Sequence, residues 1–213
     1  MLTVNEIFHS IQGESSYAGR PCVFVRLTAC DLRCVWCDSP YAFHEGTKRS
    51  IGEVAAEVQA FGCPLVEVTG GEPLLQPDVY PLMAALHQAG HQVLIETGGH
   101  RSIADLPAYV TAIMDVKCPG SGEADQHDAG NFARLRRHDE VKFVVRDRAD
   151  YDYAVAVIER EELAGRVAAI HLSPVHGELD PKTLSEWVLA DRLPARVQLQ
   201  VHKYIWGADV RGV

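Results

Sequence analysis

Cys30, Cys34 and Cys37 lie together in one short segment, Cys-Asp-Leu-Arg-Cys-Val-Trp-Cys. Spacings of four and three residues allow three thiolates to converge on one inorganic centre from a single tight loop. A structural zinc ion normally takes four Cys or His ligands, and an electron-transfer [4Fe–4S] cluster takes four thiolates. With three thiolates, one iron of a [4Fe–4S] cluster keeps an open position for a chelating cofactor. The alternative is a zinc site completed by a further cysteine or by a histidine such as His44.

A second candidate motif, Gly70-Gly71-Glu72-Pro73, follows the apolar run at residues 65–69 directly. The run predicts a strand, and α/β sheets bind ligands at the carboxyl ends of their strands. Two glycines let the backbone approach a ligand closely, and exposed carbonyls and the glutamate can accept hydrogen bonds from an ammonium group. Taken alone, the motif is also compatible with a tight turn between a strand and a helix.

The two motifs together resemble the radical SAM superfamily, in which an aromatic residue precedes the last cysteine, as Trp36 does here. The resemblance implies that the open iron binds the amino and carboxylate groups of S-adenosylmethionine (SAM). It also implies that an electron delivered through the cluster cleaves the sulfonium bond to give a 5′-deoxyadenosyl radical, so that the cofactors do the hard chemistry and the protein positions them. The residues that it implies for SAM binding are Trp36, Asp38, Thr69, Gly71, Glu72 and Ser121.

Residues 5–14, Arg26 and residues 37–41 narrow this resemblance. Within the superfamily they are similar to the lyases that make 7-carboxy-7-deazaguanine in the deazapurine (queuosine) pathway. The similarity extends through residues 115–117 to the closing segment 201–206. It implies a reaction on 6-carboxy-5,6,7,8-tetrahydropterin in which the radical abstracts the C6 hydrogen, the ring contracts, ammonia is lost and the hydrogen is returned. SAM is then a catalytic cofactor and is not consumed.

The polar residues of the first of these segments suit a pterin. A pterin presents an amino group and a ring N–H side by side, and the carboxylate of Glu14 can accept both, while Gln12 can donate or accept. The substrate carboxylate needs a planar cation, and Arg26 lies on a predicted strand that leads into the cysteine loop. The resemblance therefore implies Gln12, Gly13, Glu14 and Arg26 as substrate-binding residues. The alternative is that Gln12 and Glu14 belong to a solvated turn and that Arg26 is a surface residue of its strand.

The resemblance also implies Mg²⁺, held partly by a hydroxyl just after the cysteine motif and by the substrate itself. Mg²⁺ prefers hard oxygen ligands and few protein contacts, so one hydroxyl with substrate oxygens and water is a reasonable set. The hydroxyl here belongs to Ser39, where the family more often has threonine, and serine lacks the methyl group that restricts the rotamer. A second departure is Gly98, where the family usually has Asn or Ser, and it removes one polar contact to SAM.

Alternating strands and helices are expected to position these motifs. Ser50 with Glu53 forms a capping box at the start of one helix, and Pro181 is the first residue of another. Continuous apolar strands between amphipathic helices indicate a mostly parallel sheet with helices outside. The predicted fold class is α/β, a partial (βα) barrel of the radical SAM type, too short for eight units, in a single radical SAM domain of residues 1–213. The expected strands are residues 22–28, 65–69, 92–96, 110–116, 141–145, 168–172 and 197–201, and the expected helices are residues 51–61, 78–89 and 182–190.

Composition and charge limit the classes of partner. The net charge of −9 argues against a general affinity for nucleic acid or anionic membranes, which depends on Lys and Arg, and favours a small-molecule substrate. The sequence has no signal-peptide pattern and no run of about eighteen apolar residues, which predicts a cytoplasmic location. Because cytosolic chains rarely form disulfides, Cys22, Cys63 and Cys118 are expected to be buried and unpaired.

The main hypothesis therefore includes a [4Fe–4S] cluster on Cys30, Cys34 and Cys37, with SAM and Mg²⁺. The usual kind of electron donor is a flavodoxin or ferredoxin, and the resemblance suggests a homodimer. Within enzymes, the alternative function is an activase that makes a glycyl radical on a partner protein, because such activases share the cysteine spacing and the GGEP motif. Outside enzymes, the alternative is a zinc-stabilised binding module. His202 and Lys203 either close over the site or cap the last strand.

Overall fold

The strands of the protein form one open, mostly parallel sheet. The computed structural model describes residues 1–213, and nine strands pair in the order β3-β1-β2-β4-β5-β6-β7-β8-β9. Strand β1 is antiparallel to both of its neighbours, β2 and β3, and every other pair is parallel. The strands are β1 (Leu2–Ile11), β2 (Pro21–Leu27), β3 (Thr47–Arg49), β4 (Leu65–Gly70), β5 (Gln92–Thr97), β6 (Val110–Asp115), β7 (Glu140–Val145), β8 (Ala169–Pro174) and β9 (Arg196–Val197).

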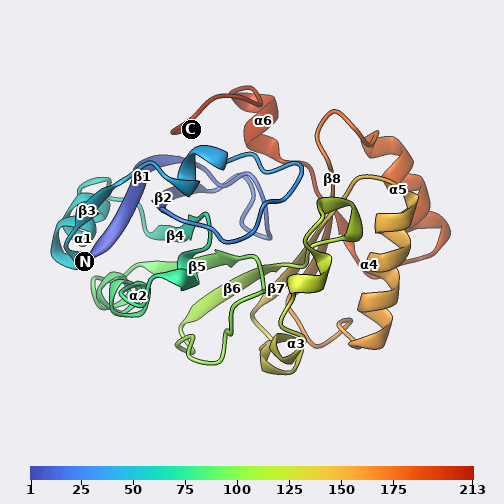
Figure 1. Ribbon diagram of the computed structural model, residues 1–213, viewed down its shortest axis with the longest axis horizontal. Coiled ribbons are helices and arrows are strands. Elements are labelled where there is room, and N and C mark those ends of the chain that lie inside the picture. The colour runs from blue at the N-terminus through green and yellow to red at the C-terminus, as the bar shows by residue number, and fades with distance from the viewer.

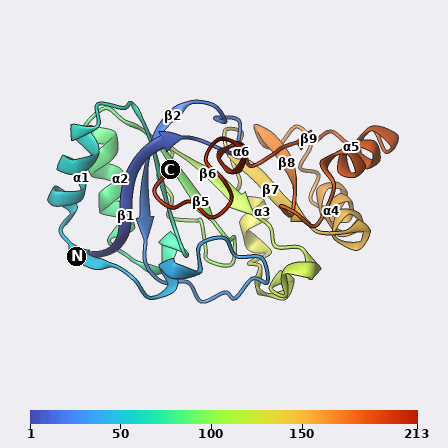
Figure 2. The same ribbon diagram turned by 90° about the horizontal axis from the view of Figure 1, so that it is seen from above.

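The helices gather at the two ends of the sheet. Helices α1 and α2 lie at one end, and α4 and α5 lie at the other (Figure 1). The last helix, α6, and the C-terminus lie over the middle of the sheet (Figure 2). The helices are α1 (Ile51–Ala60), α2 (Val79–Gln88), α3 (Gly130–Arg134), α4 (Arg148–Arg160), α5 (Pro181–Ala190) and α6 (Val201–Ile205), with short 3₁₀ turns η1 (Pro40–Phe43), η2 (Pro73–Leu75), η3 (Pro119–Ser121) and η4 (Ala124–Gln126). None of these helices has the length and apolar character needed to cross a bilayer.

Local sequence fixes the ends of the outer helices. Ser50 Oγ accepts a hydrogen bond from Glu53 N (3.3 Å), and the Glu53 carboxylate accepts one from Ser50 N (2.7 Å), so the predicted capping box opens α1. The Asp180 side chain accepts from the backbone at the start of α5. Gly90, with φ at +93°, follows α2 and adopts the left-handed backbone that favours glycine. These residues fix where α1, α2 and α5 begin or end, and each of these helices connects two strands of the sheet.

The core supports the predicted architecture. Every residue of β4, β6 and β8 is buried. The outer helices cover one face of the sheet, and the other face lines the interior of the partial barrel. Strands β3 and β9 are the two edges of the sheet, so the barrel stays open. The α/β prediction, with a mostly parallel sheet and helices outside, is confirmed.

Two segments differ from the sequence-based expectation. The predicted strand at residues 197–201 is wrong beyond its first residue, because β9 ends at Val197 and Val201 begins α6. The Val201 N–H donates to the Gly13 carbonyl (3.0 Å) and so pairs with a loop instead of a strand. Strand β1 was not among the expected strands, because its polar residues interrupt the apolar pattern, yet it pairs with β2 along most of its length.

Candidate active site

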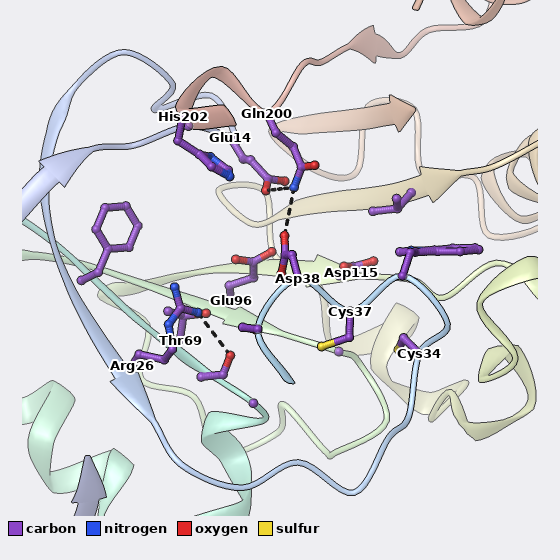
Figure 3. Close-up of a pocket in the computed structure, with 18 of the residues that line it drawn as sticks. Glu14, Arg26, Cys34, Cys37, Asp38, Thr69, Glu96, Asp115, Gln200 and His202 are labelled. Atoms are coloured by element: carbon purple, nitrogen blue, oxygen red, sulfur yellow. Dashed lines mark hydrogen bonds between the residues drawn. The ribbon is translucent and has the colours of Figure 1, made fainter. Parts of the chain in front are cut away.

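One pocket of about 320 Å³ lies at the carboxyl ends of the central strands, between the cysteine loop and α6. This volume is at the lower end of the range for small-molecule pockets. Figure 3 shows Cys34 and Cys37 on the loop at one side of the pocket, and Glu14 and Gln200 at another. The pocket therefore lies where ligands of parallel α/β sheets bind.

The cysteine loop and the GGEP turn are built against each other. The loop leaves the end of β2, where Ala29 N donates to Ala42 O (2.8 Å) and Ala29 O accepts from Glu72 N (2.8 Å). A Cβ on Gly71 would overlap the Ala29 carbonyl, so glycine is required at that position. The first cysteine and the GGEP glutamate are thereby brought to one corner of the pocket.

The three thiols predicted to hold the cluster line this pocket. Cys30, Cys34 and Cys37 are all half-buried, and burial raises the pKa of Cys30 to about 11, so iron must displace its proton. No three His, Cys, Asp or Glu side chains lie close enough together to hold a single metal ion, and a [4Fe–4S] cluster does not require this, because each thiolate binds a different iron. The remaining cysteines are buried and outside the pocket, as predicted: Cys22, Cys63 and Cys118. Three thiols are the donor set that fits a [4Fe–4S] cluster with one open iron.

Glu72 is a buried, rigidly oriented acceptor at the GGEP turn. Its carboxylate accepts from Leu74 N (3.0 Å), from Gly98 N (2.8 Å) and from the Thr97 hydroxyl (2.9 Å). Burial raises the pKa of Glu72, and no lysine or arginine lies within ion-pair distance of it. A ligand group with N–H donors would complete this environment, which fits the amino group of SAM.

Gln12 and Glu14 are held in fixed orientations before any ligand binds. Gln12 Oε1 accepts from Glu14 N (3.0 Å), and because a backbone N–H can only donate, Gln12 Nε2 must be the atom that faces and donates to Glu67. Burial first, and then the nearby Glu96 and Glu14 carboxylates, raise the pKa of Glu67 well above its ordinary value. The segment is therefore an ordered part of the pocket, and the solvated-turn alternative is wrong.

Arg26 reaches into the pocket from β2, next to Thr69 in the register of β2 and β4. Its Nε donates to Glu6 (2.7 Å), and its Nη1 donates to the Gly70 carbonyl (3.5 Å), an interaction drawn in Figure 3. The guanidinium also lies near the Tyr41 ring, 5.9 Å from its centroid. These contacts hold the guanidinium as a planar cation at the pocket wall, so the surface-residue alternative is wrong.

Lys142, on β7, is the cation at the centre of the pocket floor. Its Nζ lies 2.9 Å from Glu14 and 3.6 Å from Asp115, and it also donates to Glu96. Burial alone would lower the pKa of Lys142, but the three carboxylates raise it well above its ordinary value. In turn, although burial opposes it, Lys142 lowers the pKa of Glu14. A single buried ammonium thus keeps the predicted substrate-binding carboxylate ionised.

The C-terminal segment covers the pocket. Gln200 Nε2 donates to Glu14 (2.9 Å) and to Asp38 (3.4 Å), as Figure 3 shows. Lys203 Nζ lies 3.5 Å from Asp38, and although burial opposes it, this ammonium lowers the pKa of Asp38. His202 packs on Gly13 so tightly that a Cβ there would overlap the imidazole. His202 and Lys203 therefore close over the site and do not cap a strand.

All but one of the predicted site residues line this pocket. The exception is Ser121, which is fully buried outside it. Its hydroxyl donates to Cys118 O (2.6 Å) and accepts from Glu123 N (3.1 Å), while its carbonyl accepts from Val35 N (3.0 Å). Ser121 thus supports the cysteine loop through its backbone. The predicted residues that do line the pocket are Gln12, Gly13, Glu14, Arg26, Cys30, Cys34, Trp36, Cys37, Asp38, Ser39, Thr69, Gly71 and Glu72.

Sequence reasoning missed the buried charges of the pocket floor. Glu67 lies within β4 and Lys142 lies within the apolar part of β7 that follows Glu140, and both strands are almost wholly buried. A charge in the middle of such a strand is the signal that would have identified them, because buried charges need partners. His100 and Gln200 gave no signal, because only the tertiary structure brings them to the pocket.

Comparison with known proteins identifies the class. The model of the radical SAM superfamily matches residues 25–116, which carry both the cysteine loop and the GGEP turn. The crystal structure of QueE from Escherichia coli has the same fold, with a TM-score of 0.75 over 94% of each chain at 24% sequence identity. Streptococcus suis SuiB bound to S-adenosylmethionine matches with a TM-score of 0.58, over 81% of this chain and 48% of that chain, at 15% identity. Fold, cysteine loop and family match together define a radical SAM protein.

Relatives of known name match along the whole chain. The 7-carboxy-7-deazaguanine synthase of Koribacter versatilis (strain Ellin345) is 47% identical over 226 residues, covering 100% of both chains. That of Chlorobaculum tepidum is 47% identical over 215 residues, covering 100% of this chain and 97% of the relative. The chain belongs to the 7-carboxy-7-deazaguanine synthase family. It is a radical SAM enzyme, and a [4Fe–4S] cluster and SAM are the cofactors of that class.

Proposed function

We propose that this protein converts 6-carboxy-5,6,7,8-tetrahydropterin to 7-carboxy-7-deazaguanine with loss of ammonia, as a carbon–nitrogen lyase of deazapurine (queuosine) biosynthesis. The observation that carries the proposal is one pocket lined by the three cysteines, the GGEP turn, Gln12, Glu14 and Arg26. The [4Fe–4S] cluster and SAM, when bound, supply radical chemistry at this pocket. Substrate and product differ only by ammonia, so the conversion needs no net oxidant.

The chain's own residues bind and orient the pterin. Glu14, kept ionised by Lys142, accepts the amino group and the adjacent ring N–H as a pair. Arg26, fixed by Glu6, binds the substrate carboxylate with the free edge of its guanidinium. The α6 segment covers the pocket and limits the access of water, which protects a reactive intermediate.

The direct test is turnover by the anaerobically reconstituted protein. With SAM and a reductant, it should convert 6-carboxytetrahydropterin to 7-carboxy-7-deazaguanine, measured by liquid chromatography with mass detection. SAM cleavage without this product would contradict the proposal and favour the glycyl-radical activase. A colourless protein that contains zinc and does not bind SAM would contradict the enzyme class as well.

Replacing Arg26 or Glu14 separates the substrate assignment from the class. Arg26→Ala and Glu14→Ala should each lower kcat/KM for the pterin by at least about thirtyfold, since losing one partner of a buried charged contact costs about 2 kcal/mol or more. Iron content and SAM affinity should stay close to wild-type values, because neither side chain contacts the cysteine loop and only one long hydrogen bond, from Arg26 Nη1 to the Gly70 carbonyl (3.5 Å), reaches the GGEP turn. Arg26→Lys keeps the positive charge but lacks the paired N–H donors of the guanidinium. Its kcat/KM should therefore lie between those of the wild type and Arg26→Ala. Unchanged pterin kinetics in both alanine variants would refute the substrate assignment.

We also propose that Ser39 is a ligand of a Mg²⁺ ion that bridges to the substrate. Ser39 lines the pocket, and its hydroxyl makes no capping hydrogen bond to η1, so the oxygen is available. Ser39→Ala should raise the Mg²⁺ concentration for half-maximal turnover by roughly tenfold, equivalent to about 1.4 kcal/mol of binding. Ser39→Thr, which keeps the oxygen, should match the wild type. An identical Mg²⁺ titration for the alanine variant would exclude this role.

The assembly and cellular setting are part of the same proposal. The 213 residues form a single radical SAM domain that works as a homodimer in the cytoplasm, and a flavodoxin or ferredoxin supplies the electron. What supports the single domain is the one continuous sheet, which runs from the first strand to the last. Sedimentation of the reconstituted protein tests the dimer, and turnover with each purified donor tests the electron source.

A further inference from the structure

His100 lies in the pocket with one ring nitrogen unpaired. Its Nε2 contacts the Asp31 carboxylate at 2.7 Å, and Asp31 follows Cys30 directly in the cysteine loop. Its Nδ1 is buried without a hydrogen-bond partner and lies 3.7 Å from Glu72 Oε2. The side chain is only 6% exposed. A buried polar atom without a hydrogen-bond partner lowers the stability of the fold. We therefore expect Nδ1 to form a hydrogen bond with a ligand group.

The position of the imidazole is fixed by its surroundings. Gly98 has no side chain, and a Cβ there would lie 3.0 Å from His100 Nδ1 and 3.4 Å from Glu72 Oε2, so the ring occupies the space beside that glycine. The buried amide of Asn131 holds the loop by donating to Gly99 O (3.0 Å) and Arg101 O (2.8 Å). The loop that carries His100 is therefore ordered, and it holds Nδ1 beside Glu72 at the wall of the pocket.

The chemistry of His100 Nδ1 and the Glu72 carboxylate indicates which ligand group binds between them. In the tautomer in which Nε2 donates to Asp31, Nδ1 carries a lone pair and can accept a hydrogen bond. Glu72 is also an acceptor and has no lysine or arginine within ion-pair distance. Two acceptors 3.7 Å apart in a buried pocket match one amino group, which keeps two N–H donors when its nitrogen is bound to iron.

We propose that His100 Nδ1 accepts a hydrogen bond from the amino group of SAM beside Glu72, and that His100 is therefore a SAM-binding residue. The contact with Asp31 also joins the amino end of the cofactor to the residue next to the first cysteine. The inference rests on the proposed function, since it takes SAM to be the ligand. Gly98 has no side chain that could make a polar contact with SAM. His100, two positions further along the chain, would make such a contact instead.

The test compares two conservative variants that keep opposite ends of the imidazole. The amide of His100→Asn lies near the position of Nδ1, and that of His100→Gln lies near Nε2. The reconstituted, oxidised holoenzyme is dialysed at equilibrium against SAM, S-adenosylhomocysteine or 5′-methylthioadenosine, which lacks the amino-acid moiety. His100→Gln should bind the first two at least about tenfold more weakly and 5′-methylthioadenosine unchanged, as expected when a buried N–H donor loses its acceptor. His100→Asn should bind all three within about threefold of the wild type.

Three outcomes would overturn the inference. The first is wild-type SAM affinity in His100→Gln. The second is a weakening of 5′-methylthioadenosine binding equal to that of SAM, which would mean that His100 only shapes the pocket. The third is an equal loss of SAM affinity in His100→Gln and His100→Asn. Iron content and thermal unfolding of each variant confirm that the holoenzyme is intact. A wild-type holoenzyme that binds no SAM would instead refute the proposed function, so the two failures are distinguishable.

Discussion

Replacing Cys37 by alanine is expected to abolish the iron–sulfur centre and all turnover. Two thiolates cannot hold the cluster that three hold, because each cluster iron without a thiolate is open to solvent and to loss. Without the cluster no electron reaches SAM, so the loss of rate should be at least about 10⁶-fold, the lower end of typical enzymatic enhancements. Iron and sulfide per chain and the absorbance of the anaerobically purified protein measure the cluster. Product formation measures the consequence.

Cys63→Ala is the matched control for this experiment. Cys63 is buried, its thiol faces backbone carbonyls of Pro21 and Leu65, and it lies outside the pocket. The control variant should keep full iron content and turnover, with at most a modest loss of stability from the small cavity. Iron retained in Cys37→Ala, or iron lost in Cys63→Ala, would show that other thiols hold the metal centre.

Lys142→Met is expected to cause the second-largest effect, on both stability and turnover. The variant removes the cation that Glu14, Glu96 and Asp115 share. Glu14 and Glu96 are then left half-buried without a lysine partner, while Asp115 keeps Lys117. Breaking a buried ion pair costs about 3–5 kcal/mol, so the free energy of unfolding at neutral pH should fall by about that amount. Pterin turnover should fall by about thirtyfold, as in Glu14→Ala, because Glu14 loses its counter-charge and one of the contacts that hold it. Urea denaturation and steady-state kinetics measure the two effects.

The pH dependence identifies the cause of this loss. In the wild type, Lys142 lowers the pKa of Glu14, so the contribution of this pair is full above the ordinary value of 4.5 and is lost as pH falls through the lowered value. In the variant, burial without the counter-charge raises the pKa of Glu14 and raises that of Glu96 further, while Asp115 keeps Lys117 as a partner. The contribution of Glu14 and Glu96 to stability is then greatest at low pH and declines as pH rises. The difference in the free energy of unfolding between the two proteins should therefore be smallest below pH 4.5 and grow above it.

Two further variants complete this comparison. Lys142→Arg, which keeps a cation, should retain more stability and turnover than Lys142→Met, limited by the larger side chain. Lys182→Met removes a lysine that is 80% exposed and should change neither property. A pH-independent stability loss in Lys142→Met would indicate a packing defect in place of the uncompensated charges.

The sequence alone determined the parts of the site that are local in the chain. The spacing of Cys30, Cys34 and Cys37 and the two glycines before Glu72 are short-range features, because a few residues of backbone set which groups can face one centre. The Ser50 capping box and the alternation of apolar strands with amphipathic helices likewise gave the α/β fold before any tertiary contact was known. The charge pattern indicated a small-molecule ligand for the same reason, since it requires no knowledge of contacts.

Only the tertiary structure decided which distant residues complete the site. Lys142 meets Glu14 across 128 positions of the chain, Gln200 meets Glu14 across 186, and His100 meets Asp31 across 69. Such contacts depend on strand order, register and the path of loops, which residue spacing does not encode. The same reason explains residues 197–201, whose apolar pattern predicts a strand but whose backbone turns into α6 to meet Gly13. The sequence thus specified the groups that meet the cofactors, while folding supplied the buried charges that orient them.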